Sequence, residues 1–516
     1  MKESTYMMGV DIGTTSTKAV LFNKEGQIAA QHAVGYPLLS PSPSVAEQDP
    51  DEIYEAVVNS IKQVMLKSAV DPKSLLLISF SSAMHSVIAV DRDGNPLTKS
   101  ITWADNRSVT YADKLKNDLN GHDIYLRTGT PIHPMSPLSK LFWLRNEDKE
   151  TFNKAYKFIG IKEYVFFKLF GEYVVDYSIA SAMGMFNLKD LDWDNEALEV
   201  AGVSADQLSK LVPTTHVMKH IDPSLAERMG ISAATPFVVG ASDGVLSNLG
   251  LDAIQPGIVA VTIGTSGAVR TVSNRPVTDP KGRTFCYALT ENHWIIGGPV
   301  NNGGMTFRWV RDQLGDSEIE NAKKNGKDPY DLLTKRAEKI SPGSDGLLFH
   351  PYMAGERAPL WNADARGSFF GLALHHTRDH LIRSVLEGVI FNIYGVLLAL
   401  QELIGLPKSV QATGGFARSE LWRQIMADIF DQNVTIPESF ESSCLGAAVL
   451  GLYAIGDIDS IDVVSHMIGT THQHQPIPEN VKIYDELKPI FLSISRRMTN
   501  DYQRIADFQR EHLENK

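Results

Sequence analysis

The chain has 516 residues, more than one hydrophobic core usually supports, so we expect two large domains with a cleft between them. Apolar residues make up 43% and charged residues 21% of the chain, a composition typical of globular proteins that excludes disordered and fibrous classes. The formal net charge of -12 disfavours nucleic acid and anionic membrane as partners, so an anionic substrate must meet a locally basic pocket.

The N-terminus and the cysteines indicate a cytoplasmic protein. One lysine and several polar residues precede the first apolar run, with no apolar signal region and no small-residue cleavage site. The two cysteines, Cys286 and Cys444, lie far apart without metal-ligand spacing. We therefore expect neither a disulfide framework nor a zinc site, which fits a reducing compartment.

The first part of the chain predicts a mixed sheet. Residues 7–13, 17–22 and 28–36 are predicted as strands joined by turns. A helix follows, with Asp49 as its cap, Pro50 in its first turn and a continuous apolar face. The run "LLLISFS" is short and apolar enough for a central strand. Strands joined through a helical crossover place the chain in the α/β class.

The turn between the first two strands has the composition of a phosphate-binding loop. Glycine lets the main chain approach a phosphate closely, and hydroxyls and backbone N–H groups can donate to it. Lys18 adds a nearby cation, and Asp11 at the strand end could hold magnesium. A tight hairpin of turn-forming residues explains the spacing equally well. The candidate phosphate ligands are Gly13, Thr14, Thr15 and Ser16.

Asp243 stands among small residues in "GASDGVLSNLG", just before a predicted domain boundary near Leu251. We expect it to face the cleft, where a carboxylate can accept the proton of a substrate hydroxyl as that hydroxyl attacks phosphorus. A turn aspartate that accepts backbone N–H groups is the more common role for such a residue. From these residues alone, that second interpretation stays open.

The second half of the chain begins like the first. The run "GIVAVTIGTSGAVRTV" again has a strand, a glycine with hydroxyl residues, and a strand, which predicts two related domains, residues 1–250 and 251–516. Gly264 and Thr265 in its turn would hold a polyphosphate from the side opposite to the first loop. Neither loop fits the Walker pattern or the dinucleotide glycine pattern, so P-loop and Rossmann folds are disfavoured.

Later segments complete the second half. Residues 381–400 are apolar but contain Arg383 and Glu387, which predicts a core helix rather than a membrane span. A strand ends at Gly414 and Gly415, where a purine or ribose could approach the backbone, with a plain tight connection as the alternative. The small-residue helix "ESSCLGAAVLGLYAIG" and a charged helical tail follow.

Taken together, these residues resemble the FGGY family of carbohydrate kinases. Two long signatures carry the resemblance, "MSPLSKLFWLRNE" and "GSFFGLALHHTRDHLIRSVLE". Further motifs, among them "DIGTTSTKAVLF", "TWADNR", "PYMAGERAPLWN" and "ATGGFARSELWRQIMADIF", fall in family order, so the resemblance covers nearly the whole chain. It implies an α/β fold of two ribonuclease H-like, actin-like ATPase domains, each with a mixed β-sheet flanked by helices, closing over ATP in the cleft.

The resemblance also implies roles for individual residues. Asp11 and Asp243 would lie by a Mg²⁺ ion, with Asp243 as the catalytic base. Thr14 and Thr15 would lie near the γ-phosphate, and Thr265 would contact the phosphates from the other domain. The predicted nucleotide site comprises Asp11, Gly13, Thr14, Thr15, Ser16, Lys18, Gly264, Thr265, Gly304, Gly414, Gly415 and Ser419.

Within the family, segments such as "ISFSSAMHSVIAVD" and "IGIKEYVFFKLF" look most like gluconate kinases. Glycerol kinases place an Arg-Glu pair where this chain has Met84 and His85, and a tyrosine where it has Met135, which argues against glycerol. Xylulokinases share the Met-His pair and are the nearest rival among substrates. The predicted acceptor site comprises Met84, His85, Trp103, Arg107, Asp243 and Gly244.

A buried gluconate carboxylate needs cationic or N–H partners. His85, Arg107 and Lys162 are the candidates. For Lys162 we expect instead a solvated position on a helix, and Arg107 could equally bridge structural carboxylates such as Asp105. Trp103 is expected to be a core or pocket-wall aromatic.

The resulting hypothesis is in-line transfer of the ATP γ-phosphoryl group to the C6 hydroxyl of gluconate, with Mg²⁺ and with Asp243 as base. Domain closure would exclude water as a competing acceptor. Two alternatives stay open: the same chemistry on xylulose or another polyol, and an actin-like ATPase that uses nucleotide as a conformational switch without a sugar. The oligomeric state is also open, with a homodimer as one candidate.

Overall fold

The computed structural model describes residues 5–437 and 441–513, and these form two compact units. Unit 1 contains the described residues of Met1–Pro256, Val272–Ile296 and Glu441–Gly469. Unit 2 contains those of Gly257–Thr271, Gly297–Phe440 and Thr470–Lys516. The chain first enters unit 2 close to the predicted boundary, but two later segments return to unit 1, a feature that the sequence did not indicate.

Unit 1 is built on a mixed sheet with the strand order β13-β14-β5-β1-β2-β3. β1 and β2 are antiparallel, whereas β1, β5 and β14 run parallel to one another. The strands predicted at the N-terminus and from "LLLISFS" are confirmed, and all four have strongly apolar or alternating sequences. The strands are β1 (Tyr6–Ile12), β2 (Ser16–Asn23), β3 (Ile28–Gly35), β5 (Leu75–Ser82), β13 (Val217–Met218) and β14 (Phe237–Ser242).

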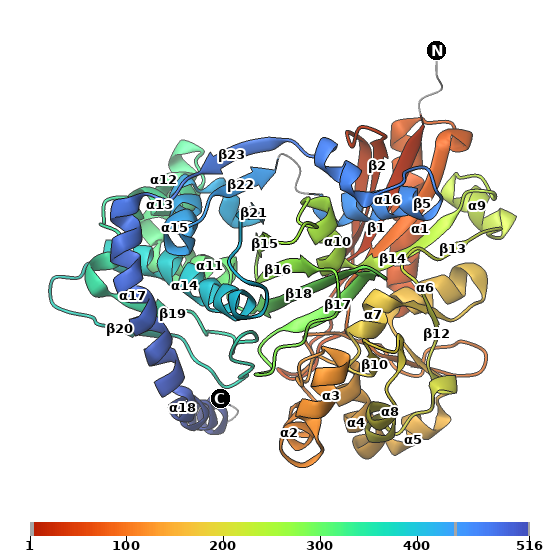
Figure 1. Cartoon of the computed structure of the whole chain (residues 1–516), viewed down its shortest axis with the longest axis horizontal. Coiled ribbons are helices and arrows are strands. Elements are labelled where there is room, and N and C mark those ends of the chain that lie inside the picture. Colours follow the sequence, from red (N-terminus) through yellow and green to blue (C-terminus); the bar gives the residue numbers. More distant parts are fainter. Residues whose placement is uncertain (1–4, 438–440, 514–516) are drawn as a thin grey trace. The chain divides into compact units, whose positions relative to one another are not determined.

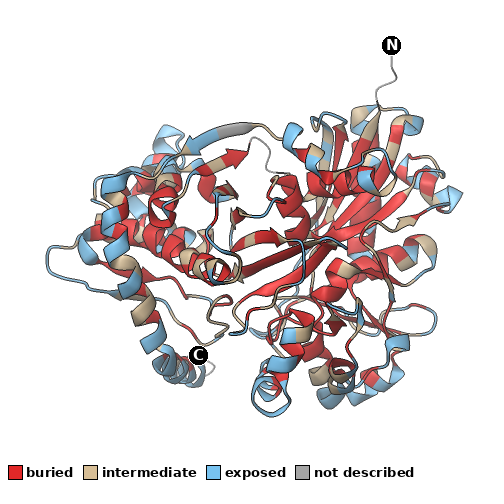
Figure 2. Cartoon of the chain, in the orientation of Figure 1, coloured by how far each residue is buried: buried red, intermediate tan, exposed pale blue. Residues whose placement is uncertain are grey.

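Helices cover both faces of this sheet (Figure 1). α1 (Pro50–Ser68) packs on β2 and β3, and α16 (Ser442–Ala454) packs on β1 and β5. Because successive side chains of a strand point to opposite faces, Met8 of β1 joins the apolar core with α1 while Met7 joins the core with α16. The central strands β1, β5 and β14 are therefore buried on both sides, whereas β3 at the edge of the sheet keeps exposed residues (Figure 2).

α16 is the predicted small-residue helix, and it packs closely against α10 (Asp243–Gly250) in unit 1. A Cβ atom at Gly446 would lie 2.0 Å from the Leu246 carbonyl oxygen, and one at Gly250 would lie 1.9 Å from the Ser442 carbonyl oxygen. Only glycine permits this approach, because any side chain would push the two helices apart. α16 thereby fixes the position of the helix that begins with Asp243.

Unit 1 has further elements outside this sheet. They are β4 (Glu47–Gln48), β6 (Ile88–Val90), β7 (Ser100–Ile101), α2 (Val109–Asp118), α3 (Gly121–Thr128), α4 (Pro137–Glu147), α5 (Lys149–Lys154), β8 (Lys157–Ile159), α6 (Ile161–Phe170), β9 (Val174–Asp176), α7 (Tyr177–Ser181), β10 (Phe186–Asn187), β11 (Asp192–Trp193), α8 (Asn195–Ala201), β12 (Lys210–Val212), α9 (Pro223–Met229) and β17 (Phe285–Thr290).

Unit 2 repeats the strand plan of unit 1. β15 pairs antiparallel with β16 and parallel with β21, which pairs parallel with β22, and β22 pairs antiparallel with β23. The same succession of pairs runs from β2 through β1, β5 and β14 to β13 in unit 1. The topology thus agrees with the predicted relation between the halves. The strands are β15 (Ile258–Ile263), β16 (Gly267–Ser273), β21 (Ser409–Thr413), β22 (Val434–Pro437) and β23 (Thr470–His474).

α14 (Arg378–Ile404) is the long core helix of unit 2. Of the helices in the described ranges, α14 alone is long and apolar enough to cross a membrane by length and composition, and most of its apolar stretch is buried inside the protein (Figure 2). The predicted core helix is therefore confirmed. The remaining elements include β18 (His293–Val300), α11 (Gly304–Leu314), α12 (Asp316–Asn325), α13 (Pro329–Ala337), β19 (Leu348–His350), β20 (Ser368–Phe370), α15 (Glu420–Phe430), α17 (Pro478–Arg497) and α18 (Thr499–Leu513).

Candidate active site

The parallel strands of unit 1 end at one edge of the sheet, and both predicted carboxylates lie there. Asp11 near the end of β1 is opposite Ser81 of β5, and Ser242, the last residue of β14, also pairs with β5. Asp243 follows at once as the first residue of α10, and its Oδ1 accepts a 2.6 Å hydrogen bond from the Gly244 N–H. Because parallel strands present their carboxyl ends on the same side, the fold brings two acids that are distant in sequence together.

The carboxylates of Asp11 and Asp243 influence each other electrostatically. Burial and the neighbouring Asp243 carboxylate raise the pKa of Asp11 to about 6. A 2.6 Å hydrogen bond from the Ser81 hydroxyl and the charge of Lys18 act in the opposite direction. A cation would relieve this repulsion, and Mg²⁺ commonly takes one or two carboxylates and completes its shell with water and phosphate oxygens. Asp11 and Asp243 therefore fit the predicted magnesium ion.

No closed metal site competes with this pair within the described ranges. The described histidines, cysteines and acids form no group of three or more that could hold a metal ion. A pair of carboxylates would leave most of the shell of a Mg²⁺ ion to water and phosphate oxygens.

The hairpin between β1 and β2 holds Thr14 through two neighbouring side chains. The Gly13 N–H closes the turn by donating to the Ser16 carbonyl oxygen at 3.0 Å. The indole N–H of Trp103 donates to the Thr14 hydroxyl at 2.9 Å, and the Gln48 amide donates to the Thr14 carbonyl oxygen at 2.6 Å. Since an indole can only donate, the Thr14 hydroxyl is the acceptor and keeps its own proton for an acceptor such as a phosphate oxygen.

Thr15 and Lys18 occupy different settings. Thr15 is exposed at the tip of the hairpin. Lys18 lies opposite Asp11 in the β1–β2 pair and forms a 2.9 Å ion pair with Glu441. The Lys18 charge therefore already acts on protein carboxylates, and its direct contact with a phosphate stays a prediction.

Met84 and His85 follow the end of β5. Met84, Thr14 and Trp103 line one small cavity of unit 1. His85 is buried and has a φ of 72°, a left-handed conformation that is uncommon for a residue with a Cβ atom. Its Nδ1 lies 2.8 Å from the Ala182 carbonyl oxygen, so Nδ1 carries a proton and donates it. His85 is thus fixed in backbone and ring orientation, as strained residues at functional sites often are.

The two predicted cations are both engaged with protein carboxylates. Arg107 pairs with Asp105 at 2.8 Å and with Glu47, which is the bridging role given above as an alternative. Lys162 has a side chain that is only 3% exposed and pairs with Asp176 at 2.6 Å. The expected solvated position of Lys162 is therefore wrong, because this carboxylate and two carbonyl oxygens of β14, those of Val239 and Ala241, each 3.2 Å away, replace water.

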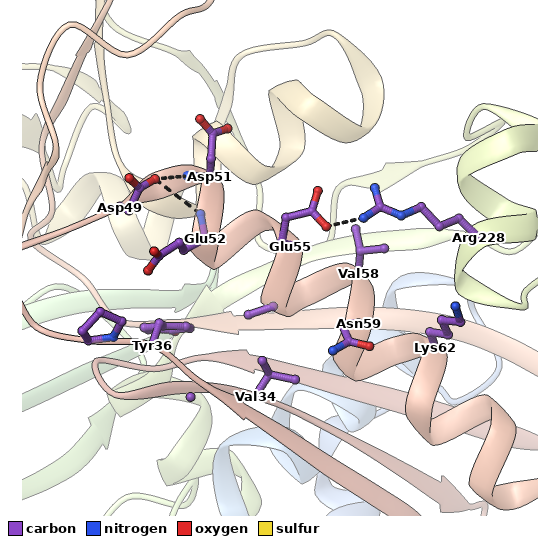
Figure 3. Close-up of a pocket in the computed structure, with 13 residues that line it drawn as sticks. Val34, Tyr36, Asp49, Asp51, Glu52, Glu55, Val58, Asn59, Lys62 and Arg228 are labelled. Carbon is purple, nitrogen blue, oxygen red and sulfur yellow. Dashed lines mark hydrogen bonds and ion pairs between the residues drawn. The ribbon is translucent and has the colours of Figure 1, made fainter.

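A cavity of about 650 Å³ between α1 and β3 is a separate feature of unit 1 (Figure 3). Asp49 lines it and caps α1 as predicted, accepting the N–H groups of Asp51 and Glu52. Figure 3 shows Glu55 and Arg228 pointing toward each other, and they form an ion pair. Its wall contains no residue of the predicted site, and Asp49 and Glu55 in it serve as a cap and an ion-pair partner, so we assign it no part in the chemistry.

Unit 2 has a pocket of about 310 Å³ where β15 and β21 end. Its wall contains five residues that the sequence predicted for the nucleotide: Gly264, Thr265, Gly304, Gly415 and Ser419. Both the loop after β15 and the loop after β21 contribute, which follows from the parallel pairing of these strands. The pocket has the volume of a typical small-ligand site.

Aromatic side chains that the sequence analysis missed complete this pocket. Phe416 and Trp422 belong to the same motif as Gly415 and Ser419, so the motif itself offered a signal for them. Phe307 on α11 and Tyr330 on α13 come from other segments, and no local signal marked them. Flat apolar walls with a few polar groups suit a purine ring. The charged residues Arg308, Asp328, Asp331 and Arg418 lie in the same wall.

The hairpin after β15 is held by the start of α11. The Gly304 N–H donates to the Gly264 carbonyl oxygen at 2.7 Å, and the next N–H donates to the Thr265 carbonyl oxygen. A Cβ at Gly304 would lie 2.7 Å from that Gly264 oxygen. Gly414 has a φ of 106°, and its Cβ would lie 2.3 Å from the Ile263 carbonyl oxygen, so it lies against β15 while Gly415 lines the pocket.

Comparisons with known proteins all find similarity to carbohydrate kinases. The model of the N-terminal domain of the FGGY family of carbohydrate kinases matches residues 6–250, and that of the C-terminal domain matches residues 259–455. A gluconokinase from Bacillus subtilis is 61% identical over 508 residues, which is 98% of this chain and 99% of that protein.

Two solved structures from Lactobacillus acidophilus are similar to this one. A gluconate kinase has a TM-score of 0.92 at 38% identity, over 98% of this chain and 100% of that chain. A ligand-bound xylulose kinase has the same TM-score of 0.92 and the same identity of 38%, over 97% of this chain and 100% of that chain. Similarity of fold therefore does not separate the two sugars.

Proposed function

Because the chain belongs to the FGGY family of carbohydrate kinases, we propose that it transfers the γ-phosphoryl group of ATP to the C6 hydroxyl of D-gluconate, giving 6-phosphogluconate. The observation that carries the choice of gluconate is the 61% identity with a gluconokinase over 98% of the chain. The solved structures named for gluconate and for xylulose are each only 38% identical, so they weigh less in this choice.

We propose that the pocket of unit 2 binds the adenosine part of ATP. Its aromatic walls suit a purine, and its two glycine loops leave room for the main chain to approach ribose and phosphates. The Thr14 hydroxyl, held as an acceptor by Trp103, donates its proton to a γ-phosphate oxygen. Mg²⁺, held by Asp11 and Asp243 when bound, supplies neutralising charge on the phosphates.

Asp243 is the proposed base. Phosphoryl transfer has a loose transition state, so positioning of the hydroxyl matters more than strong activation of it. The Gly244 N–H bond and the close packing of α10 on α16 fix the Asp243 side chain. Its carboxylate can then orient the C6 hydroxyl and take its proton.

His85 is the proposed contact for the sugar chain. Because its Nδ1 proton is donated to Ala182, Nε2 of the neutral ring is an acceptor, which suits a sugar hydroxyl. The ring would bind the gluconate carboxylate only in its protonated form. We also propose that the enzyme works in the cytoplasm, where ATP is available, and keep a homodimer as the candidate assembly.

The test is an ADP-release assay of the purified protein with gluconate, xylulose, ribulose, fuculose and glycerol. We expect the highest kcat/KM with gluconate and little ATP consumption without a sugar. A higher value with xylulose would move the assignment to the alternative substrate. ATP hydrolysis at the same rate with and without sugars would support the nucleotide-switch ATPase instead.

A further inference from the structure

Lys140 is a buried lysine that the proposed mechanism does not use. It lies on α4 (Pro137–Glu147) within the first family signature and is 1% exposed. Its ammonium donates to the carbonyl oxygen of His85 at 2.9 Å and to the carbonyl oxygen of Met135. These two carbonyls belong to different segments, the one that follows β5 and the one that precedes α4.

The burial of Lys140 is unfavourable by itself. Among the described residues no carboxylate forms an ion pair with it, and burial lowers its pKa to about 7. The charge of Asp105 raises this pKa and that of Arg107 lowers it further. A methionine would fill similar space without desolvating a charge, so packing alone gives no reason for a lysine at this position.

The His85 carbonyl is a point where a hydrogen bond has a large structural effect. His85 holds a left-handed backbone conformation, and without a partner for its carbonyl oxygen the backbone of His85 could relax to a less strained conformation. Such a relaxation would displace Met84, which lines a cavity with Thr14 and Trp103, and would break the Nδ1 bond to Ala182. Lys140 thus holds the residues on which the acceptor site depends.

We propose that Lys140 is a positioning residue for the sugar acid: by joining the His85 and Met135 carbonyl oxygens, it fixes the Met84–His85 segment against the loop before α4. The inference rests on the proposed kinase function. In this role Lys140 acts through protein carbonyl oxygens and not on the reacting atoms, so we expect its effect to fall on the affinity for the acceptor. Lys140 does not line the pocket of unit 2, so we expect the affinity for ATP to be unaffected.

The test compares Lys140→Met with the wild type. Methionine has a similar length but no donor, so we expect the KM for gluconate to rise at least tenfold while the KM for ATP changes by less than twofold. Lys140→Gln, which can donate to one carbonyl, is expected to lie between the two. If Lys140→Met does not fold, the test uses Lys140→Gln alone. A rise in the KM for gluconate without a rise in the KM for ATP then supports the proposal.

Tyr125→Phe is the matched control for stability. The Tyr125 hydroxyl is a buried donor to the Thr284 carbonyl oxygen at 2.7 Å in the same unit, and neither residue belongs to the predicted site. We expect this variant to lower the melting temperature without changing the KM for gluconate. The inference is overturned if Lys140→Met keeps the wild-type KM for gluconate, or if both KM values and kcat change only as much as they do in Tyr125→Phe.

Failure of the proposed function is recognised separately. If the wild type phosphorylates another sugar instead of gluconate, the KM values for that sugar and for ATP are compared between the variants and the wild type, and this comparison tests the role of Lys140. If the wild type hydrolyses ATP without any sugar, the kinase proposal fails and the role of Lys140 fails with it. Only the first comparison, of variants with an active wild type, tests Lys140 itself.

Discussion

The two units share a succession of strands but differ in what stands at the strand ends. In unit 1, β1 carries Asp11 ahead of the Gly13-Thr14 turn. In unit 2, β15 carries Thr262 at the corresponding place ahead of the Gly264-Thr265 turn. Both turns keep a glycine and a threonine, whereas only the first has a carboxylate beside it.

The same succession of strands carries different functional groups in the two units. In unit 1, β14 is followed by Asp243, whose charge raises the pKa of Asp11. In unit 2, β21 occupies the place of β5 in the succession of strands, and Gly414 and Gly415 follow it beside a pocket with aromatic walls. The repeated topology therefore supplies paired strand ends and N–H donors, and the side chains placed there assign acid chemistry to one unit and ring binding to the other.

The largest expected effect is that of replacing Asp243, the proposed base of unit 1. Asp243→Asn should lower kcat by about 10²–10⁴, the range for loss of a general base, while ATP binding by calorimetry stays within about twofold. Asp252→Asn is the control, because burial also raises the pKa of Asp252 in unit 1 to about 6 although it lies outside the strand ends. Near-normal turnover of Asp243→Asn would end its assignment as base.

The contrast in helix packing can be tested next. Gly446→Ala in α16 should destabilise the protein by about 1–3 kcal/mol and lower kcat, because its Cβ would lie 2.0 Å from the Leu246 carbonyl oxygen and displace α10. Gly395→Ala in α14 of unit 2 is the matched control, since its nearest neighbour would be an ordinary 3.6 Å away. Equal unfolding free energies for both variants in denaturant titrations would contradict the packing argument.

The two units also differ in how they keep a buried cation. Arg383 of unit 2 pairs with Glu387 at 2.8 Å, whereas within the described part of the chain Lys140 of unit 1 donates only to carbonyl oxygens. The pKa of Lys140 falls from 10.5 to about 7 in the folded state, so the penalty for burying its charge is complete below pH 7 and declines as the pH rises toward 10.5.

The stability of the wild type relative to Lys140→Met should therefore increase between pH 7 and pH 9. The slope is at most about 1.4 kcal/mol per pH unit. Denaturant unfolding of both proteins at several pH values measures it. A constant difference across this range would show that the charged form of Lys140 is not disfavoured in the folded protein.

The smallest expected effect concerns the pocket of unit 2. A Cβ at Gly415 would have no atom within 4 Å, so Gly415→Ala should change the unfolding free energy by less than about 0.5 kcal/mol. If a nucleotide lies against this glycine, the KM for ATP should rise about tenfold, or about 1.4 kcal/mol, with the KM for gluconate unchanged. An unchanged KM for ATP would remove Gly415 from the nucleotide site and weaken the division of tasks between the units.

The sequence by itself determined the local elements and the residues worth testing. The strands around the first turn, the Asp49 cap of α1 and the core helix α14 follow from alternation, capping and apolar content, which act between neighbours in the chain. The family signatures likewise depend only on the order of residues.

Only the tertiary structure decided where distant residues meet. It returned α16 to unit 1, placed Phe307 and Tyr330 in the pocket of unit 2, and buried Lys162 against Asp176. The physical reason is that burial and charge pairing depend on contacts between segments far apart in sequence. A lysine on a helix has the same local pattern whether its neighbour in space is water or a carboxylate.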